Sequence, residues 1–322
     1  MSLFRNLVWF AKGLKEYTKS GFEAASRQFR AEDLQADISH RSFMITGANS
    51  GIGKSAALAI ARQGGTVHMV CRSRQRGEAA MAEIIEASGN QNVHLHELDM
   101  SRPRDIFAFA RSFADSGKPL HVLINNAGVL VAEKERQLTP EGLEVTFATN
   151  SLGTHILTTA LIPVLSQQEE PRVVIVTSGG MLVQKLDLRD LQSEKQRTFD
   201  GTMAYAQTKR QQVVLTEQYA NKFPTIHFSC MHPGWADTPG VQSSIPDFHA
   251  KMKDRLRTTE QGADTMVWLA VAPCVKDLPS GLFFQDRKAV STHLPLAWTK
   301  ATPQECEQLV TILEDTSKQY AA

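Results

Sequence analysis

The sequence has little cysteine, no long hydrophobic run and almost no net charge, and each shortage excludes a class of protein. Its cysteines are far apart and form no C-x-x-C pair, so we expect no disulfide framework and an intracellular, reducing compartment. Apolar runs fall far short of the ~20 residues that a membrane-spanning helix needs. With 35 basic residues against 34 acidic ones, no nucleic-acid partner is expected. No histidine has a second ligand at metal-binding spacing, so no metal is expected either.

Short β-branched runs alternate with helical patterns from residue 42 onward. The predicted strands are 42–46, 66–71, 93–98, 120–124, 172–176, 226–231 and 282–284. The predicted helices are 52–63, 77–88, 103–114, a long one between 139 and 165, 203–222 and 262–272. Such alternation requires parallel strands joined by right-handed crossovers. The sequence therefore predicts an α/β fold, a Rossmann-type doubly wound parallel sheet of about seven strands with helices on both faces.

Residues 40–322 are expected to form one domain, preceded by a helical extension over 1–39. The first thirty residues carry six basic side chains against two acidic ones, and their apolar residues recur at helical spacing. Such a helix fits the surface of an anionic membrane. It equally fits packing on the domain's own flank, and a targeting segment is a third interpretation. A cytoplasmic or a peripherally membrane-associated protein is expected.

A glycine-rich segment, Thr46–Gly53, follows the first predicted strand and opens a helix. Gly47 permits a tight turn, Gly51 allows close approach of a pyrophosphate, and Gly53 allows helix and strand to pack closely. The amino end of the helix then offers unpaired N–H groups to phosphate. A dinucleotide site is expected here.

The spacing Gly-x-x-x-Gly-x-Gly resembles the first turn of the short-chain dehydrogenase/reductase family. The resemblance covers residues 40–290 and, around Cys71 and between Ser178 and Tyr205, is nearest to the family's retinol-dehydrogenase-like branch. It implies cofactor contacts along the whole groove. These are Gly47, Asn49, Ser50, Gly51, Ile52, Gly53, Asp99, Met100, Asn126, Ala127, Gly128, Pro233, Gly234, Trp235 and Thr238.

The second strand ends without an acidic residue to accept a hydrogen bond from the 2′-hydroxyl of NAD. Arg72 stands there instead, and Lys54 adds a cation just beyond the glycine loop. A guanidinium binds phosphate oxygens in a bidentate manner, so NADP(H) is favoured over NAD(H). The alternative is that Arg72 is a solvated surface residue.

Tyr205 and Lys209 lie at i and i+4 on one predicted helix, so they share a face. A nearby ammonium favours the phenolate and is expected to lower the pKa of the tyrosine. The family resemblance implies that both are catalytic and also contact the cofactor. It further implies Ser178 as the group that, with Tyr205, binds the substrate oxygen, and Asn150 as a proton relay. Thr177 is the rival hydroxyl beside Ser178.

The resemblance implies an oxidoreductase that interconverts a small-molecule carbonyl and an alcohol, on a lipid-like substrate such as a retinoid, steroid or fatty compound. Specificity is expected in segments 181–204 and 239–258. In the second of these, Val241, Ile245, Phe248 and Met252 form either an apolar lid or the loop's own core. The alternative function is a catalytically weak NADP(H)-binding sensor or scaffold. A homo-oligomer is common in the family.

Overall fold

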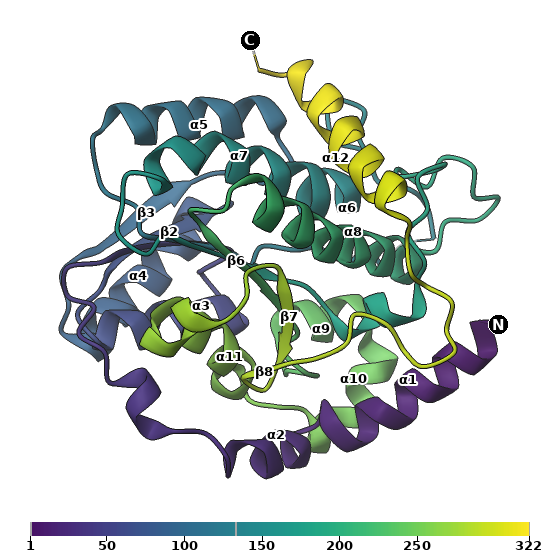
Figure 1. The fold of residues 1–322 in the computed structure, drawn as a ribbon, viewed down its shortest axis with the longest axis horizontal. Coiled ribbons are helices and arrows are strands. Elements are labelled where there is room, and N and C mark those ends of the chain that lie inside the picture. The colour runs from purple at the N-terminus through teal and green to yellow at the C-terminus, as the bar shows by residue number, and fades with distance from the viewer. Residues whose placement is uncertain (1, 133, 322) are drawn as a thin grey trace.

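The computed structural model describes residues 2–132 and 134–321, and eight strands of this chain form a single sheet (Figure 1). Their order is β3-β2-β1-β4-β5-β6-β7-β8, and all neighbours are parallel except β7 and β8. The strands are β1 (Ser42–Thr46), β2 (Thr66–Cys71), β3 (Val93–Glu97), β4 (Val122–Asn125), β5 (Arg172–Val176), β6 (His227–Met231), β7 (Leu282–Gln285) and β8 (Lys288–Ala289).

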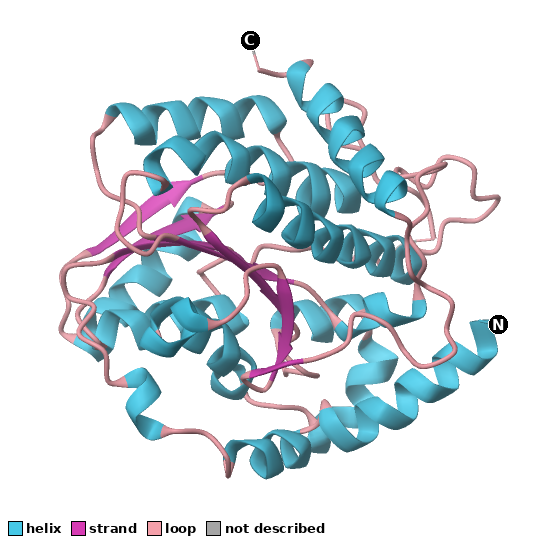
Figure 2. Ribbon diagram, viewed as in Figure 1, coloured by secondary structure: helices cyan, strands magenta, loops and turns pink. Residues whose placement is uncertain are grey.

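Helices cover both faces of this sheet (Figure 2). Before the first strand come α1 (Ser2–Glu16), α2 (Lys19–Ser26) and the 3₁₀ turn η1 (Ala31–Leu34). The helices that follow are α3 (Gly51–Arg62), α4 (Arg74–Ser88), α5 (Pro103–Asp115), α6 (Val145–Phe147), α7 (Thr154–Leu165), α8 (Gly201–Lys222), α9 (Pro239–Ser244), α10 (Pro246–Met252), α11 (Thr259–Val271) and α12 (Pro303–Lys318). A π-helical segment, η2 (Ala148–Gly153), and three 3₁₀ turns, η3 (Gly179–Val183), η4 (Lys253–Arg255) and η5 (Pro273–Asp277), complete the described elements.

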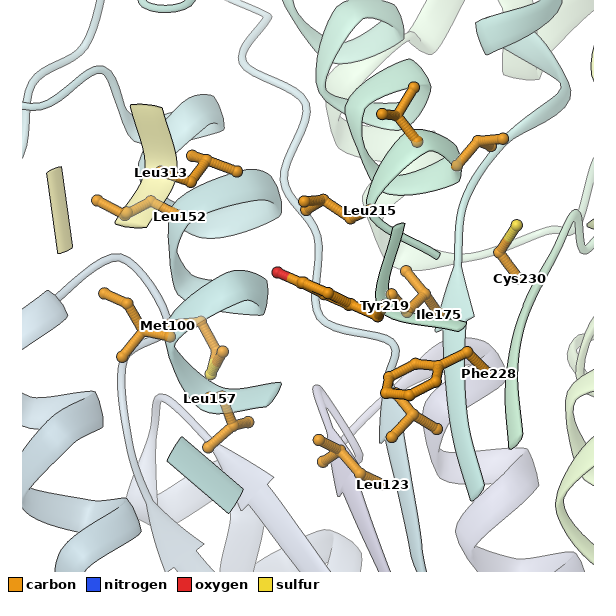
Figure 3. Packing of buried hydrophobic residues seen from close by; sticks show 14 of the residues in the cluster. Met100, Leu123, Leu152, Leu157, Ile175, Leu215, Tyr219, Phe228, Cys230 and Leu313 are labelled. Atoms are coloured by element: carbon orange, nitrogen blue, oxygen red, sulfur yellow. The ribbon is translucent and has the colours of Figure 1, made fainter. Parts of the chain in front are cut away.

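The core is divided by the alternation of side chains along each strand. In β5, Val173 and Ile175 join the cluster beneath α5, α7, α8 and α12, whereas Val174 and Val176 join the cluster beneath α3, α4 and α11. Period-two burial on both faces is what a strand in the middle of a parallel sheet requires. Figure 3 shows the first cluster, where side chains of α8 meet the sheet: Leu215, Tyr219, Leu123, Ile175 and Phe228.

The predicted fold class is confirmed, and the seven predicted strands are present within two residues of their expected ends. The sequence analysis missed β8, a two-residue antiparallel strand too short to show a period. The helix expected from 139 begins only at Val145 and is interrupted by η2. Helix α12 was also not predicted, although its capping box is a signal present in the sequence: Thr302 and Glu305 flank Pro303.

The polar loops of the fold gather at the carboxyl ends of the parallel strands. Because β1 is flanked by β2 and β4, the chain leaves β1 and β4 in opposite directions across the sheet, and a crevice opens between their ends. The glycine segment follows β1, Asn126 follows β4 and Ser178 follows β5. Ligand sites of open α/β sheets form at such a switch point. Within the described residues, the structure contains no helix long and apolar enough to cross a membrane.

Candidate active site

The glycine loop has the backbone that phosphate binding needs. Gly47 and Gly51 adopt φ values of +67° and +55°, a region that disfavours other residues. A Cβ at Gly53 would lie 2.4 Å from both the Asn126 Nδ2 and the Gly47 carbonyl oxygen, so only glycine fits there. Ser50 precedes the first turn of α3, and its side chain caps no backbone N–H. These N–H groups are therefore available to phosphate oxygens, and the loop fits a dinucleotide.

Asn126 ties the ends of β1 and β4 together. Its Nδ2 donates to the Thr46 carbonyl at 2.8 Å and to the Gly47 carbonyl at 3.3 Å. The backbone N–H groups of Asn126 and Ala127 donate to the Thr46 hydroxyl, at 3.0 and 2.9 Å. Four hydrogen bonds thus fix the crevice against which a cofactor would lie, with Gly128 exposed at its edge.

The expected chemical centre is assembled between α8 and the end of β5. The Lys209 Nζ lies 5.3 Å from the centroid of the Tyr205 ring. Ser178 faces the Tyr205 hydroxyl closely enough to affect the pKa of that group. Its rival, Thr177, is buried and donates its hydroxyl to the Lys209 carbonyl at 2.7 Å. Thr177 therefore anchors α8 to the sheet, and Ser178 remains the candidate hydroxyl of the site.

Lys209 is held by partners that its motif does not include. Its Nζ donates to the Val176 carbonyl at 2.9 Å and to the Gln212 Oε1 at 3.0 Å. The Gln212 Nε2 then donates to the backbone carbonyl of Asn150 at 2.7 Å. Gln212 is completely buried, and it connects the lysine to Asn150 without an intervening water. The sequence analysis missed Gln212, whose position one turn after the lysine on the same helical face was the available signal.

Asn150 lies in η2, where the helix widens to a π pattern. Its Oδ1 accepts from the Val129 N–H at 2.9 Å, and its Nδ2 donates to the Val129 carbonyl and the Thr208 hydroxyl, each at 3.0 Å. The side chain is therefore locked, and its backbone carbonyl joins the lysine network through Gln212. Single π turns are frequent at functional sites because they redirect one carbonyl out of the helical ladder.

Burial controls the ionisation of the two central groups. It raises the pKa of Tyr205 to about 12, and the contact with Ser178 offsets only part of the rise. It lowers the pKa of Lys209 to about 7. The sequence argument expected Lys209 to lower the pKa of the tyrosine, but here desolvation of the phenolate outweighs that attraction. The phenol is consequently protonated at neutral pH.

Comparison with known proteins assigns the chain to a family. A family model described as short chain dehydrogenase matches residues 41–188. Dehydrogenase/reductase SDR family member 12 from Bos taurus is 58% identical over 320 residues, 99% of this chain and 100% of that protein; the Homo sapiens protein of the same name matches equally. The chain belongs to the short-chain dehydrogenase/reductase family. It is therefore an oxidoreductase with the NAD(P)(H)-binding fold typical of that family.

Other relatives extend the same family. Retinol dehydrogenase 12 from Mus musculus is 34% identical over 249 residues, covering 76% of this chain and 77% of that protein. A short chain dehydrogenase from Shigella flexneri, complexed with NADP, has a TM-score of 0.63 at 22% identity and covers 79% of this chain and 100% of its own. A 3-ketoacyl-(acyl-carrier-protein) reductase from Brucella melitensis, complexed with NADH, has a TM-score of 0.60 at 22% identity, covering 76% and 95%. At this identity the solved structures share the fold.

The adenosine end of the short-chain dehydrogenase/reductase groove is less constrained than the chemical centre. Arg72 is exposed at the end of β2, and Asp99 accepts hydrogen bonds from the Ser101 N–H and hydroxyl, at 2.9 and 2.8 Å. Met100 is buried behind it. Lys54 forms a salt bridge with Glu83 of α4, so it is not aimed at the groove. The expected second cation is therefore committed to another partner.

Some residues of the segment after β6 lie beside the groove, and others contact the N-terminal helices. Thr238 lies beside the glycine loop, because a Cβ at Gly51 would be 3.2 Å from its Cγ2, and its hydroxyl accepts from the Val241 N–H. Asn49, Ile52 and Pro233 are partly buried around the same loop. The Trp235 ring instead packs on Trp9, Phe10, Tyr17 and Phe248.

Tyr17 of the N-terminal extension contacts the loop after β6 and, through it, the loop after β5, a contact that no local sequence pattern predicts. Its buried ring meets the His232 ring edge-on with centroids 4.4 Å apart. The His232 Nδ1 accepts from the Gly179 N–H at 2.9 Å, so it supports the residue next to Ser178. Burial lowers the pKa of His232 well below its usual range, so the ring stays neutral and keeps accepting that bond. His232 therefore positions the serine loop.

Arg257 fastens the N-terminal extension to the body of the protein. Its buried guanidinium donates to the Asp286 carboxylate at 2.6 and 3.0 Å and to the backbone carbonyls of Glu16 and Thr18 at 2.6 and 3.3 Å. Phe248 and Met252, candidates for an apolar lid, pack in the same region against Tyr17 and Trp235. These two residues therefore pack against residues outside segment 239–258, including the N-terminal extension. Val241 and Ile245 remain partly exposed.

A cavity of about 510 Å³ opens beside the amino end of α8, three residues before Tyr205. Both segments expected to set specificity contribute to it, one through 198–202 and the other through Ser244. Its wall combines apolar and polar residues. The lining residues are Leu130, Val131, Ala132, Lys134, Thr198, Phe199, Asp200, Gly201, Thr202 and Ser244.

Proposed function

We propose that this short-chain dehydrogenase/reductase is an NADP(H)-dependent enzyme that interconverts a lipid-like carbonyl and its alcohol. The observation that carries the proposal is the convergence of Tyr205, Ser178 and Lys209 at the carboxyl end of β5, beside a glycine loop suited to a dinucleotide. Three sequence segments far apart in the chain meet there. In a surface Tyr–Lys pair, the alternative, the lysine would not be buried as Lys209 is, and the tyrosine would not meet Ser178.

Each residue of the site has a separate role in the proposed reaction. Bound NADPH would supply a hydride to the carbonyl carbon, leaving NADP⁺. The Ser178 hydroxyl donates a hydrogen bond to the carbonyl oxygen as negative charge develops on it. Tyr205 gives that oxygen its proton, so one hydride and one proton convert C=O to CH–OH. Lys209, held by Gln212, supplies the positive charge and the path through which the phenolate is reprotonated.

The protonation state of Tyr205 favours the reductive direction. A phenol with a pKa of about 12 carries its proton at neutral pH and is ready to donate it. Oxidation of an alcohol would need the phenolate, which burial disfavours. At neutral pH the site is therefore protonated as carbonyl reduction requires, while the ratio of NADPH to NADP⁺ sets the net direction.

NADP(H) is proposed over NAD(H) on the evidence of the β2 end. No carboxylate occurs in the segment 71–74, and Arg72 is exposed where a 2′-phosphate would lie. The Shigella flexneri structure holds NADP, while the Brucella melitensis one holds NADH, so the fold accommodates both. The choice therefore rests on Arg72, since Lys54 is paired with Glu83.

The proposed substrate is a lipid-like aldehyde or ketone. The cavity at the amino end of α8 is lined by Leu130, Val131 and Phe199 together with polar residues. Retinol dehydrogenases are among the relatives, at 34% identity and below over about three quarters of the chain. Such substrates partition into membranes, which accords with a peripheral membrane contact through residues 1–30. A homo-oligomer is compatible with the same chemistry.

The test is consumption of NADPH against retinoid, steroid and medium-chain carbonyls, with Tyr205→Phe as the control. Turnover that disappears in the control establishes the reaction and identifies the substrate class. Tight NADPH binding without turnover on any carbonyl would instead support the catalytically weak sensor or scaffold. Full activity of the Tyr205→Phe variant would overturn the proposed mechanism.

A further inference from the structure

Helix α1 packs Val8, Trp9 and Leu14 against the protein and carries a second group of apolar residues on the side that faces away from it. Leu3 and Leu7 are 71% and 62% exposed, and Phe4 and Phe10 are exposed beside them. The side that faces the protein includes polar residues: the Arg5 guanidinium lies near the Val183 carbonyl. A surface helix of a soluble protein normally has a single apolar stripe, which it buries, and polar residues on its outer side. An outward apolar stripe indicates a partner that is not part of this chain.

A second exposed apolar pair lies in the segment between β8 and α12. Leu296 and Trp298 are 76% and 74% exposed, while the intervening Ala297 is buried. Both exposed residues adopt left-handed backbone conformations, with φ of +55° and +54°. Bulky side chains rarely adopt this region, and neither gains packing from it. The segment is nevertheless anchored, since Leu294 and Ala297 belong to the main core cluster.

These two segments flank the same element, η3, which directly follows Ser178. Arg5 of α1 donates to Val183, the last residue of η3. Arg210 of α8 joins η3 to the second segment by donating to the carbonyls of Met181 and Thr292 at 2.9 and 2.8 Å. In Figure 1 the yellow chain after β8 runs toward α1 before it turns into α12. Among the described residues, the large exposed hydrophobics outside these two segments are Leu138 and Met203.

We propose that Leu3, Phe4, Leu7, Phe10, Leu296 and Trp298 form an interfacial surface that inserts into an anionic lipid bilayer. The basic side chains around this surface favour an anionic bilayer as its partner. Lys15, Lys19 and Arg27 are exposed and form no salt bridge within the described part of the chain, and Lys300 is exposed two residues after Trp298. The first thirty residues contain two acidic side chains: Glu16, which binds Lys12, and the exposed Glu23. Cations around leucine, phenylalanine and tryptophan match a negatively charged headgroup layer above acyl chains.

The position of this surface connects lipid binding to the proposed reaction. Because η3 begins one residue after Ser178, the bilayer would lie close to the mouth of the site. A lipid-like carbonyl could then reach the site from the membrane without crossing water. This consequence rests on the proposed function; the binding of lipid does not.

The experiment is co-sedimentation of the full-length protein with vesicles of phosphatidylcholine alone and of phosphatidylcholine mixed with phosphatidylserine. Binding is expected to the mixed vesicles, and raised salt should weaken it. Leu7→Ser and Trp298→Ser should each weaken partitioning by roughly tenfold, since each removes a large apolar anchor. Lys15→Glu with Lys19→Glu should do the same through charge. Leu138→Ser, an exposed leucine elsewhere, is the matched control and should bind normally.

Several outcomes would overturn this surface. Failure to bind either vesicle type, or equal loss in the Leu138→Ser control, would do so. If gel filtration shows wild type to be a dimer that Leu7→Ser or Trp298→Ser converts to a monomer, a second copy is the occupant instead. Tyr205→Phe should sediment like wild type, and turnover of a short water-soluble aldehyde without vesicles reports the chemistry separately. Loss of the reaction and loss of lipid binding are therefore distinguishable.

Discussion

The two ends of the cofactor groove are built differently. At the chemical end every central side chain has protein partners: Lys209 binds Val176 and Gln212, and Asn150 binds Val129 and Thr208. At the adenosine end, Arg72 is exposed and no hydrogen bond or salt bridge from it is found among the described residues. The chemistry is therefore preorganised, whereas recognition of the adenosine end awaits the ligand. Substitutions at the first end should change turnover, and those at the second should change cofactor binding.

The largest expected effect is that of Tyr205→Phe. Removing the hydroxyl removes the proton donor, and general acid catalysis contributes about 10²- to 10⁴-fold to a rate. We expect kcat to fall by about 10³-fold while the Kd for NADPH, measured by fluorescence, stays within a few-fold of wild type. A variant that loses NADPH binding equally would mean that the two ends are not separable.

Gln212→Leu should have the next largest effect on kcat. The substitution removes one of the two acceptors of the Lys209 ammonium, leaving the Val176 carbonyl, and it deprives the buried Asn150 carbonyl of its side-chain donor. Leaving such groups unsatisfied costs about 1–3 kcal/mol each, so we expect kcat to fall about 10- to 100-fold with a smaller change in KM for NADPH.

Gln211→Leu is the control for Gln212→Leu. Gln211 is equally buried on α8, but it accepts from Ser151 and does not touch Lys209. Thermal unfolding should show a loss of stability in both variants, and kcat should fall in Gln212→Leu alone. Equal losses of kcat would show that Gln212 acts only through stability.

The pH profile tests the charge at the chemical end. Burial lowers the pKa of Lys209 to about 7, so the lysine is charged below that pH and becomes neutral above it. If its charge assists the reaction, kcat/KM for reduction should fall above about pH 7, by up to about tenfold per pH unit. The fall should be absent in Lys209→Met, whose residual rate should be flat in this range. Tyr205 does not produce it, because its pKa is about 12.

At the adenosine end, Arg72→Ala should weaken NADPH binding by about tenfold or more, the loss of a charge-assisted hydrogen bond. NADH, which lacks the 2′-phosphate, should bind as before, so the ratio of kcat/KM for the two cofactors falls. Arg74→Ala is the matched control, since Arg74 is already paired with Glu97 and Glu78. No change in the ratio would mean that Arg72 is merely a solvated residue and that the NADP preference is wrong.

The same contrast explains how much could be predicted from the sequence. Tyr205, Ser178 and the glycine loop belong to short motifs whose spacing survives in any chain of this fold, and so does the alternation that predicts the sheet. Gln212, His232 and Tyr17 act through contacts with segments 53 to 215 positions away. Such contacts depend on how elements pack, which no local pattern encodes. The sequence predicts that α1 is basic and amphipathic, but it does not predict which side of the helix faces the protein.

The smallest expected effect is that of Lys54→Ala, and it sharpens the comparison most directly. The sequence argument placed Lys54 beside a phosphate, whereas the structure pairs it with the exposed Glu83 of α4. An exposed ion pair contributes about 0–1 kcal/mol, so the variant should bind NADPH within about twofold of wild type and unfold at nearly the same temperature. Glu83→Ala separates the two accounts, because it releases the lysine. If Lys54 can turn to the phosphate, Glu83→Ala should tighten NADPH binding but not NADH binding, and Lys54→Ala should cancel the gain. If neither substitution matters, recognition of the 2′-phosphate is left to Arg72 alone.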